Sequence, residues 1–244
     1  MAKPKSFEII FEDQNLIVVN KTSGLLTIPD RYAPGLPNLK DLLIDLYGDI
    51  FVVHRIDKDT SGLILFAKDS ETHRELSLLF QNDQISKEYL ALVEGHLETK
   101  DGLINTSISE NPKKPGKMRS GGEDAKESLT EYTVLEEFKN YSLVQVRPKT
   151  GRTHQIRIHF QSIGHPLAVD PFYGNRDKLF LSNIKKRYKG KEEQEEKPIM
   201  SRLTLHAAKL SFLDPKTKEV RTFEASIHKD MNATLNQLRK QLGR

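Results

Sequence analysis

The sequence predicts an α+β fold with a largely antiparallel sheet and flanking helices. Apolar, β-branched segments occur in pairs joined by short polar turns, at residues 7–11 with 16–20, 129–138 with 141–147, and 203–213 with 220–227. Such pairs are typical of β-hairpins. Helical patterns separate the first two pairs, and strand pairs combined with separate helices indicate the α+β class.

Two segments between the first two strand pairs have the apolar spacing of amphipathic helices. Asn38 can cap a helix whose leucines share one face and which Gly48 ends, and Asp69 or Ser70 can cap a second helix that reaches about Asn82. Residues 22–37 contain two Gly and three Pro. They therefore predict an irregular connection before the first helix.

Further elements are expected along the rest of the chain. Residues 63–67 and 86–94 are apolar enough to be strands, the former buried on both faces. Residues 153–163 predict a helix ended by Gly164, and Asp230 can cap a helix at the C-terminus. Residues 107–127 form a polar tract with Lys113, Lys114, Lys117 and Arg119. This tract is either a mobile, solvated loop or a loop that binds phosphate.

Length and composition set broad limits. A chain of 244 residues predicts a single domain, 1–244, in which the strongly charged residues 175–198 are a solvated insertion. There is no Cys, so no disulfide or thiolate site is possible. The first residues lack a signal-peptide pattern and no segment is apolar enough to span a membrane, so we expect a cytoplasmic protein. The net charge of +4 is compatible with a polyanionic partner.

The chemistry is concentrated in one loop. His54, Arg55, Asp57 and Asp59 lie between the short apolar run 51–53 and the strand predicted at 63–67. A loop carried by rigid strands is a common place for catalytic groups, although a solvated charged loop would have the same composition. Gly62, at the end of the loop, permits the positive φ of a tight turn.

Several other chemistries lack their motifs. The sequence has no GxGxxG or GxxxxGK phosphate loop and no GxSxG elbow. It has no HExxH pair, and His154 and His159 are five residues apart, which is a poor spacing for two ligands on one helical face. We therefore expect neither a cofactor nor a catalytic metal.

Five segments, in order, resemble the motifs of one enzyme family. HRIDKDTSG at residues 54–62 is similar to the HRLDxxTSG signature of the RluA-type pseudouridine synthases. GRTHQIRIH at 151–159 and KEYLALVEG at 87–95 resemble two further motifs of that family. GHPL at 164–167 with Tyr173-Gly174, and LHA at 205–207, complete the set. Val169 stands where the family usually has Gly, and Thr22 where it has Pro.

The resemblance implies a long, mainly antiparallel mixed sheet with flanking helices, the pseudouridine synthase catalytic fold. It implies isomerisation of uridine to pseudouridine in structured ribosomal or transfer RNA, with no cofactor. Some family members carry a small S4-like RNA-binding domain at the N-terminus. The strand predicted from Phe7 onward leaves no room for one here, and we expect a monomer without membrane contact.

The resemblance also assigns roles to individual residues. Asp57 is the catalytic carboxylate, as a nucleophile or a base, and Arg157 is its cationic partner. Tyr89 packs on the uracil and is a candidate for the final proton removal, and Arg55 enters the space left by the flipped base. Two roles remain open for a last group of residues, which either contact RNA or cap and pack the helix. This group consists of Arg152, His154 and Gln155.

Two other functions remain alternatives. A non-catalytic RNA-binding module would use the basic residues alone, but an anionic Asp57 in a phosphate-binding loop would repel RNA. A hydrolase could use Asp57 and Asp59 as an acid/base pair. That pair requires both side chains in one site, with Lys58 between them in the sequence.

Overall fold

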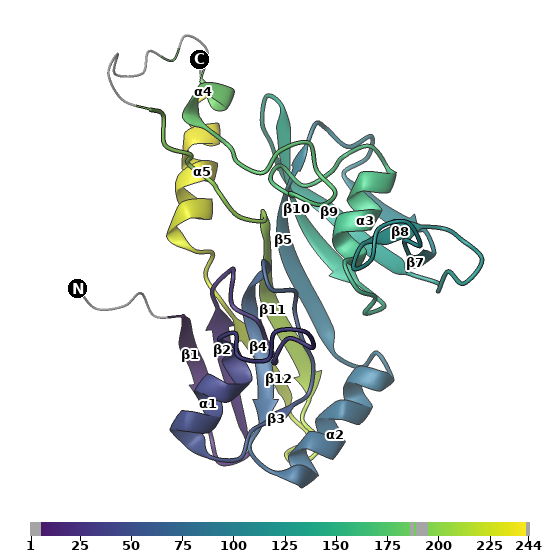
Figure 1. Cartoon of the computed structure of the whole chain (residues 1–244), viewed down its shortest axis with the longest axis vertical. Coiled ribbons are helices and arrows are strands. Elements are labelled where there is room, and N and C mark those ends of the chain that lie inside the picture. Colours follow the sequence, from purple (N-terminus) through teal and green to yellow (C-terminus); the bar gives the residue numbers. More distant parts are fainter. Residues whose placement is uncertain (1–5, 186–187, 189–194, 243–244) are drawn as a thin grey trace. The chain divides into compact units, whose positions relative to one another are not determined.

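The computed structural model describes residues 6–185, 188 and 195–242 (Figure 1). The chain divides into two compact units. The first covers Met1–Tyr89 and His206–Ser226, and the second covers Leu90–Leu205 and Ile227–Arg244, as far as these ranges are described. The boundary falls inside strands β5 (Ser86–Glu94) and β11 (Leu205–Leu213). The single-domain interpretation stays a prediction.

The first unit is a small mixed sheet with two helices. Its strands follow the order β1-β2-β4-β11, with β3 beside β4 and β12 beside β11. The pair β4/β11 is parallel, whereas β1/β2, β2/β4, β3/β4 and β11/β12 are antiparallel. The elements are β1 (Phe7–Glu12), β2 (Leu16–Lys21), α1 (Leu39–Tyr47), β3 (Phe51–Val52), β4 (Ser61–Ala67), α2 (Ser70–Gln81) and β12 (Val220–Glu224).

Both faces of this sheet are covered by apolar side chains, as predicted for residues 63–67. On β4, Leu63 and Leu65 belong to the cluster that includes Leu76 of α2. Ile64 and Phe66 point to the opposite face and join the cluster that includes α1. Every residue of β4 is buried. A strand that is apolar at successive positions is thus explained by one helix packed on each face.

Both helices begin at the predicted capping residues. The Asn38 side chain accepts a hydrogen bond from the Asp41 amide (3.0 Å), and Asp69 accepts one from the Thr72 amide (2.8 Å). These side chains satisfy amide groups that the first helical turn leaves without partners. α1 ends at Gly48, as the sequence predicts.

Gly62 is required where β4 approaches β11. Its φ is +114°, and a Cβ placed there would lie 2.2 Å from the Ala207 carbonyl oxygen. Next to it, Ser61 Oγ is 3.0 Å from Nδ1 of the buried His206. The TSG and LHA segments of the sequence therefore meet within the first unit, which places the end of the 54–62 loop.

The second unit contains the strand order β5-β10-β9-β6, a separate two-stranded sheet β7-β8, and three helices. Strand pairs β6/β9, β9/β10 and β7/β8 are antiparallel. The elements are β6 (Asp101–Asn105), β7 (Ile108–Glu110), β8 (Met118–Ser120), β9 (Leu129–Glu137), β10 (Tyr141–Pro148), α3 (Gln155–Ser162), α4 (Leu181–Ile184) and α5 (Lys229–Arg239). The predicted class, an α+β fold with a mixed, mainly antiparallel sheet and flanking helices, is confirmed.

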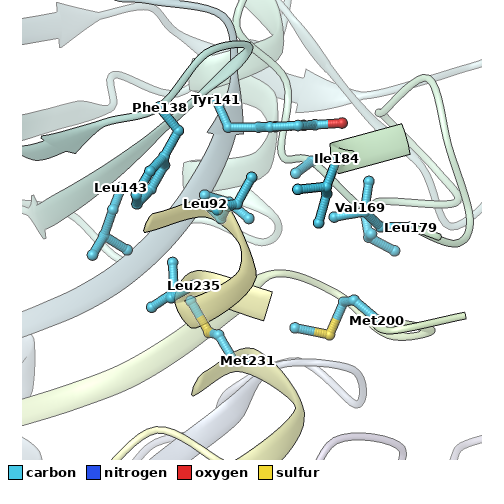
Figure 2. Packing of buried hydrophobic residues seen from close by; sticks show 12 residues of the cluster. Leu92, Phe138, Tyr141, Leu143, Val169, Leu179, Ile184, Met200, Met231 and Leu235 are labelled. Atoms are coloured by element: carbon cyan, nitrogen blue, oxygen red, sulfur yellow. The ribbon is translucent and has the colours of Figure 1, made fainter. Parts of the chain in front are cut away.

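The core of the second unit gathers side chains from distant parts of the chain (Figure 2). Leu92 of β5 and Leu143 of β10 pack with Leu235 of α5. Leu179 and Ile184 also belong to this core, although they lie in the predicted charged insertion 175–198. Residues 186–187 and 189–194 of that segment lie outside the described residues, so the insertion stays a prediction for them.

Three local expectations need correction. The polar tract 107–127 was expected to be a loop, either mobile and solvated or phosphate-binding, but it contains the hairpin of β7 and β8. The helix expected at 153–163 begins at Gln155, after His154 adopts a left-handed φ of 56°. Asp230 does not cap α5: it lies in the first turn and binds Arg202 through both carboxylate oxygens (2.6 and 2.7 Å). β6 is an additional strand.

Among the described residues, no helix is long and apolar enough to cross a membrane.

Candidate active site

The 54–60 loop of the first unit is held by the segment that follows β2. Backbone carbonyls of the loop accept hydrogen bonds from this segment: Ile56 from Thr27 Oγ1 (2.9 Å), Lys58 from the Gly24 amide (2.9 Å), and Asp59 from Ser23 Oγ (2.7 Å). The intervening Asp57 carbonyl accepts from the Thr60 amide within the loop (3.1 Å). The backbone on both sides of Asp57 is thus fixed, while its side chain is half-buried.

A buried lysine joins these two segments. Lys21, the last residue of β2, has 0% of its surface exposed. Its ammonium group donates to the carbonyls of Thr22 (3.0 Å), Leu25 (2.8 Å) and Lys58 (2.9 Å). Burial of a charge is unfavourable unless it is well hydrogen-bonded, and three carbonyls supply this compensation. Lys21 was not predicted as a site residue; a lysine that ends a strand begun by the apolar run 16–19 was the signal for it.

His54 is an anchor for the loop. Burial, together with the smaller effect of the neighbouring positive charge of Lys87, lowers the pKa of its imidazole from 6.5 to about 3. The neutral ring accepts a hydrogen bond at Nε2 from the Leu65 amide (3.0 Å) and stacks on Phe80, with 4.4 Å between the ring centroids. The ring therefore ties the start of the loop to β4 and α2.

Asp57 and Tyr89 lie close enough to interact electrostatically within the first unit. Burial raises the pKa of the Tyr89 phenol well above its ordinary value, and the negative charge of Asp57 raises it further. Tyr89 also packs against the apolar cluster that contains Ile56. Arg55, by contrast, is exposed. The first unit thus brings two of the predicted catalytic residues together and presents Arg55 to solvent.

Arg157, the third predicted catalytic residue, lies in the second unit and is only 2% exposed. Its Nε and one terminal nitrogen donate to the two carboxylate oxygens of Asp170 (2.8 and 2.7 Å). Its guanidinium carbon is 5.3 Å from the ring centroid of Phe172 and 4.9 Å from that of Tyr173. Arg157 is therefore not a surface residue of the helix. Its pairing with Asp57 stays a prediction.

The residues around the start of α3 differ in their surroundings. Gln155 is buried: its amide group donates to Leu129 O and Thr130 Oγ1 (both 3.0 Å), and its oxygen accepts from the Arg152 amide (3.0 Å). These contacts favour the capping and packing alternative for Gln155. The His154 ring lies 2.7 Å from the Tyr173 hydroxyl, and the exposed Arg152 side chain donates to a backbone carbonyl (3.2 Å).

Asp170 is a residue whose role was not recognised in the sequence. Besides binding Arg157, its Oδ1 accepts from the amides of Phe172 (2.8 Å) and Tyr173 (3.1 Å). It is fully buried, so the ion pair fixes the turn at 170–174 against α3. Within the described parts of the chain, no cluster of three or more His, Cys, Asp or Glu side chains could hold a metal ion.

The family is established by comparison with known proteins. The family model described as RNA pseudouridylate synthase matches residues 15–162, more than half of the sequence. The chain belongs to this family, whose members are isomerases, and the resemblance to the RluA-type enzymes is confirmed.

Individual relatives are similar over nearly the whole chain. An uncharacterized RNA pseudouridine synthase of Bacillus subtilis, YlyB, is 36% identical over 98% of this chain and 75% of its own length. The dual-specificity RNA pseudouridine synthase RluA of Vibrio cholerae is 36% identical over 88% of this chain and 80% of its own. The solved structure of human RNA pseudouridylate synthase domain containing 4 superposes with a TM-score of 0.73 at 26% identity, covering 95% of this chain and 92% of that one.

Replacement of the buried lysine tests how the loop is held. Lys21→Met keeps the length of the side chain but removes the donor of the Thr22 and Leu25 carbonyls, whereas the Lys58 carbonyl keeps the Gly24 amide. We expect the free energy of unfolding in urea to fall by about 2 kcal/mol or more, since each buried polar group left without a partner costs about 1–3 kcal/mol. Lys68→Met is the control, because its ion pair with Glu12 is at the surface, where such pairs contribute little to stability. Equal losses in the two variants would contradict the role of Lys21.

The buried imidazole makes stability depend on pH. The folded chain holds His54 neutral down to a pKa of about 3, whereas the unfolded chain protonates it near 6.5. Unfolding therefore takes up a proton between these values, and the free energy of unfolding falls as the pH falls through this window. We expect His54→Gln to reduce this slope by up to about 1.4 kcal/mol per pH unit. Urea titrations at several pH values measure it, with His73→Gln as the control for loss of an imidazole elsewhere. An unchanged slope would exclude the assignment.

Proposed function

We propose that this protein isomerises uridines of ribosomal or transfer RNA to pseudouridine, with Asp57 as the catalytic carboxylate. The observation that carries the proposal is the fixed backbone on both sides of Asp57, which presents a half-buried carboxylate beside Tyr89. Family membership supports the reaction class. The relatives are named for ribosomal large-subunit and dual-specificity RNA pseudouridine synthases, which supports the choice of RNA.

In the proposed reaction, the N-glycosidic bond of the uridine breaks, the uracil turns within the site, and a bond from its C5 carbon to the same sugar carbon replaces the broken bond. C5 then loses its proton and the freed N1 gains one, so the product is an isomer of the substrate. No electrons are exchanged, so redox chemistry is not required. Asp57 acts on the ribose, as a nucleophile or as a base. The surrounding segment holds Asp57 in place during both bond changes, which provides the orientation on which such a reaction depends.

Tyr89 is proposed to pack on the uracil. Because burial and the charge of Asp57 both raise its pKa, Tyr89 is held as a neutral phenol. A neutral phenol is a weak base, so its environment favours the packing role over the final proton removal. The ring can still restrict the directions in which the detached uracil turns.

Arg157 is proposed as the cation that pairs with Asp57. A guanidinium has five N–H donors, and the bidentate contact with Asp170 uses two of them. Asp170 would keep the planar group in a fixed orientation, which is how a supporting residue improves the geometry of a site. The substrate is proposed as structured RNA, and a monomeric, cytoplasmic enzyme stays a prediction.

The central test exchanges one carboxylate for an amide. Asp57→Asn keeps the size of the side chain, so the variant should fold and bind RNA but release essentially no tritium from RNA that carries 5-tritiated uridine. Asp59→Asn is the matched control, since Asp59 is a half-buried carboxylate of the same loop. It should retain most of the activity. Substantial tritium release by Asp57→Asn would contradict the assignment.

The same assay separates the alternative functions. Loss of activity in both variants would favour an acid/base pair of Asp57 and Asp59. A wild-type protein that binds the tritiated RNA but releases no tritium would be an RNA-binding module without this reaction.

The exposed Arg55 is proposed to support base flipping. A uridine within folded RNA must leave its stack before Asp57 can reach the sugar, which costs a few kcal/mol. A guanidinium can stack on neighbouring bases and occupy the vacated space. Arg55→Ala should therefore lose at least about tenfold more single-turnover rate on a stem-loop than on an unstructured oligonucleotide with the same uridine.

Lys58→Ala is the control for this comparison, because Lys58 is an exposed cation of the same loop. It should lower both rates by similar factors. If Arg55→Ala also lowers both rates equally, Arg55 acts on the chemistry or on the loop and not on flipping.

A further inference from the structure

The second unit presents an aromatic ring to solvent beside its buried ion pair. Phe172 is 47% exposed, although its backbone amide is held by the fully buried Asp170 (2.8 Å). The Arg157 guanidinium, which is itself buried, lies 5.3 Å from the centroid of the ring. The backbone of Phe172 is therefore anchored, while part of its ring is accessible to solvent. Exposure of a large apolar ring on a rigid turn is a feature of binding surfaces.

A cation from the hairpin of β7 and β8 lies beside this ring. The ammonium group of Lys117 is 4.8 Å from the Phe172 centroid and donates to the Phe172 carbonyl (3.3 Å). The next residue, Met118, donates its amide to the Tyr173 hydroxyl (2.8 Å). These contacts join the hairpin of β7 and β8 to the 170–174 turn. Lys113 and Lys114, in the connection between the two strands, are exposed.

An accessible aromatic ring with a movable cation beside it matches the requirements of a single nucleotide. Every base can stack on an aromatic face, and the phosphate attached to it requires a positive charge nearby. Lys117 can supply that charge, since its flexible stem lets the ammonium group leave the ring when a base takes its place. A double helix cannot use such a ring, because its bases are already stacked on each other.

We propose that Phe172 and Lys117 form a nucleotide subsite for an unpaired residue of the substrate RNA, separate from the uridine that reacts. The base stacks on Phe172, and Lys117 pairs with an adjacent phosphate. This subsite rests on the proposed function only in that its ligand is a strand of the substrate RNA. It gives a specific task to part of the 107–127 tract, and it favours substrates with an unpaired nucleotide near the target.

Equilibrium binding of the full chain to a short fluorescein-labelled oligouridylate tests the ring. Phe172→Ala should weaken this binding by roughly ten- to hundredfold, the range found for loss of one stacked base. Phe172→Tyr keeps an aromatic face and should bind almost as the wild type does. Leu135→Ala is the matched control: Leu135 is an apolar side chain of the same unit with the same exposed fraction of 47%. It should leave the affinity unchanged.

A second probe separates stacking from general loss of affinity. A blunt RNA duplex of the same length should bind equally well to the wild type and to Phe172→Ala. With 2-aminopurine in the oligouridylate, the wild type and Phe172→Tyr should quench the fluorescence of the stacked base, and Phe172→Ala should not. Unchanged affinity of Phe172→Ala for the single strand, or an equal loss on the duplex, would overturn the subsite.

The role of Lys117 is measured by salt. Lys117→Met should reduce the slope of log affinity against log salt by about 0.7, the value for one phosphate contact with a single strand. An unchanged slope would remove Lys117 from the subsite. If the ring instead packs against a second copy of this chain, sedimentation of the wild type would show association that Phe172→Ala abolishes. That result would contradict the proposal.

Failure of this proposal differs from failure of the proposed function. Binding to oligouridylate requires no turnover, whereas tritium release from 5-tritiated RNA requires it. Wild-type affinity in Phe172→Ala together with normal tritium release would remove the subsite and leave the enzyme. Loss of affinity in Phe172→Ala with no tritium release by the wild type would keep the subsite and remove the reaction.

Discussion

The backbone of the candidate active site depends on the hydrogen bonds that the Lys21 ammonium group donates. This group lies at the end of a wholly buried strand and binds carbonyls from two irregular segments, one of which carries Asp57. Neither segment has a ladder or helix to satisfy its own backbone groups. A single buried cation with several donors provides this for both segments at once. The position of Asp57, the proposed catalytic carboxylate, is therefore set by the backbone contacts of its loop.

The second unit uses the opposite charge in the same way. The buried carboxylate of Asp170 binds the Arg157 guanidinium and two backbone amides of the 170–174 turn. This turn also contacts the hairpin of β7 and β8 through the Tyr173 hydroxyl and the Phe172 carbonyl. In a pair of this kind, loss of one partner leaves an unpaired buried charge. Substitutions of Asp170 should therefore disturb α3, the turn and the hairpin together.

Regular elements of this fold could be predicted because their signals are local. The caps Asn38 and Asp69 and the continuous apolar run of β4 each lie within a few residues of the element that they define. Elements fixed by distant partners could not be predicted. β6 pairs with β9, some 30 residues away, and β7 and β8 are short, polar strands. Asp230 has the composition of a cap, but its partner is Arg202, which no local pattern indicates.

For the candidate site, the motifs indicate candidate residues but not the surroundings of each one. His54, Arg55 and Asp57 belong to one motif, yet the structure gives them different surroundings: a neutral ring stacked on Phe80, an exposed cation and a half-buried carboxylate. His54 is not available as a base, because its Nε2 already accepts a hydrogen bond from the Leu65 amide. Tyr89 is held as a phenol. The proton transfers and bond changes of the proposed reaction therefore fall to Asp57.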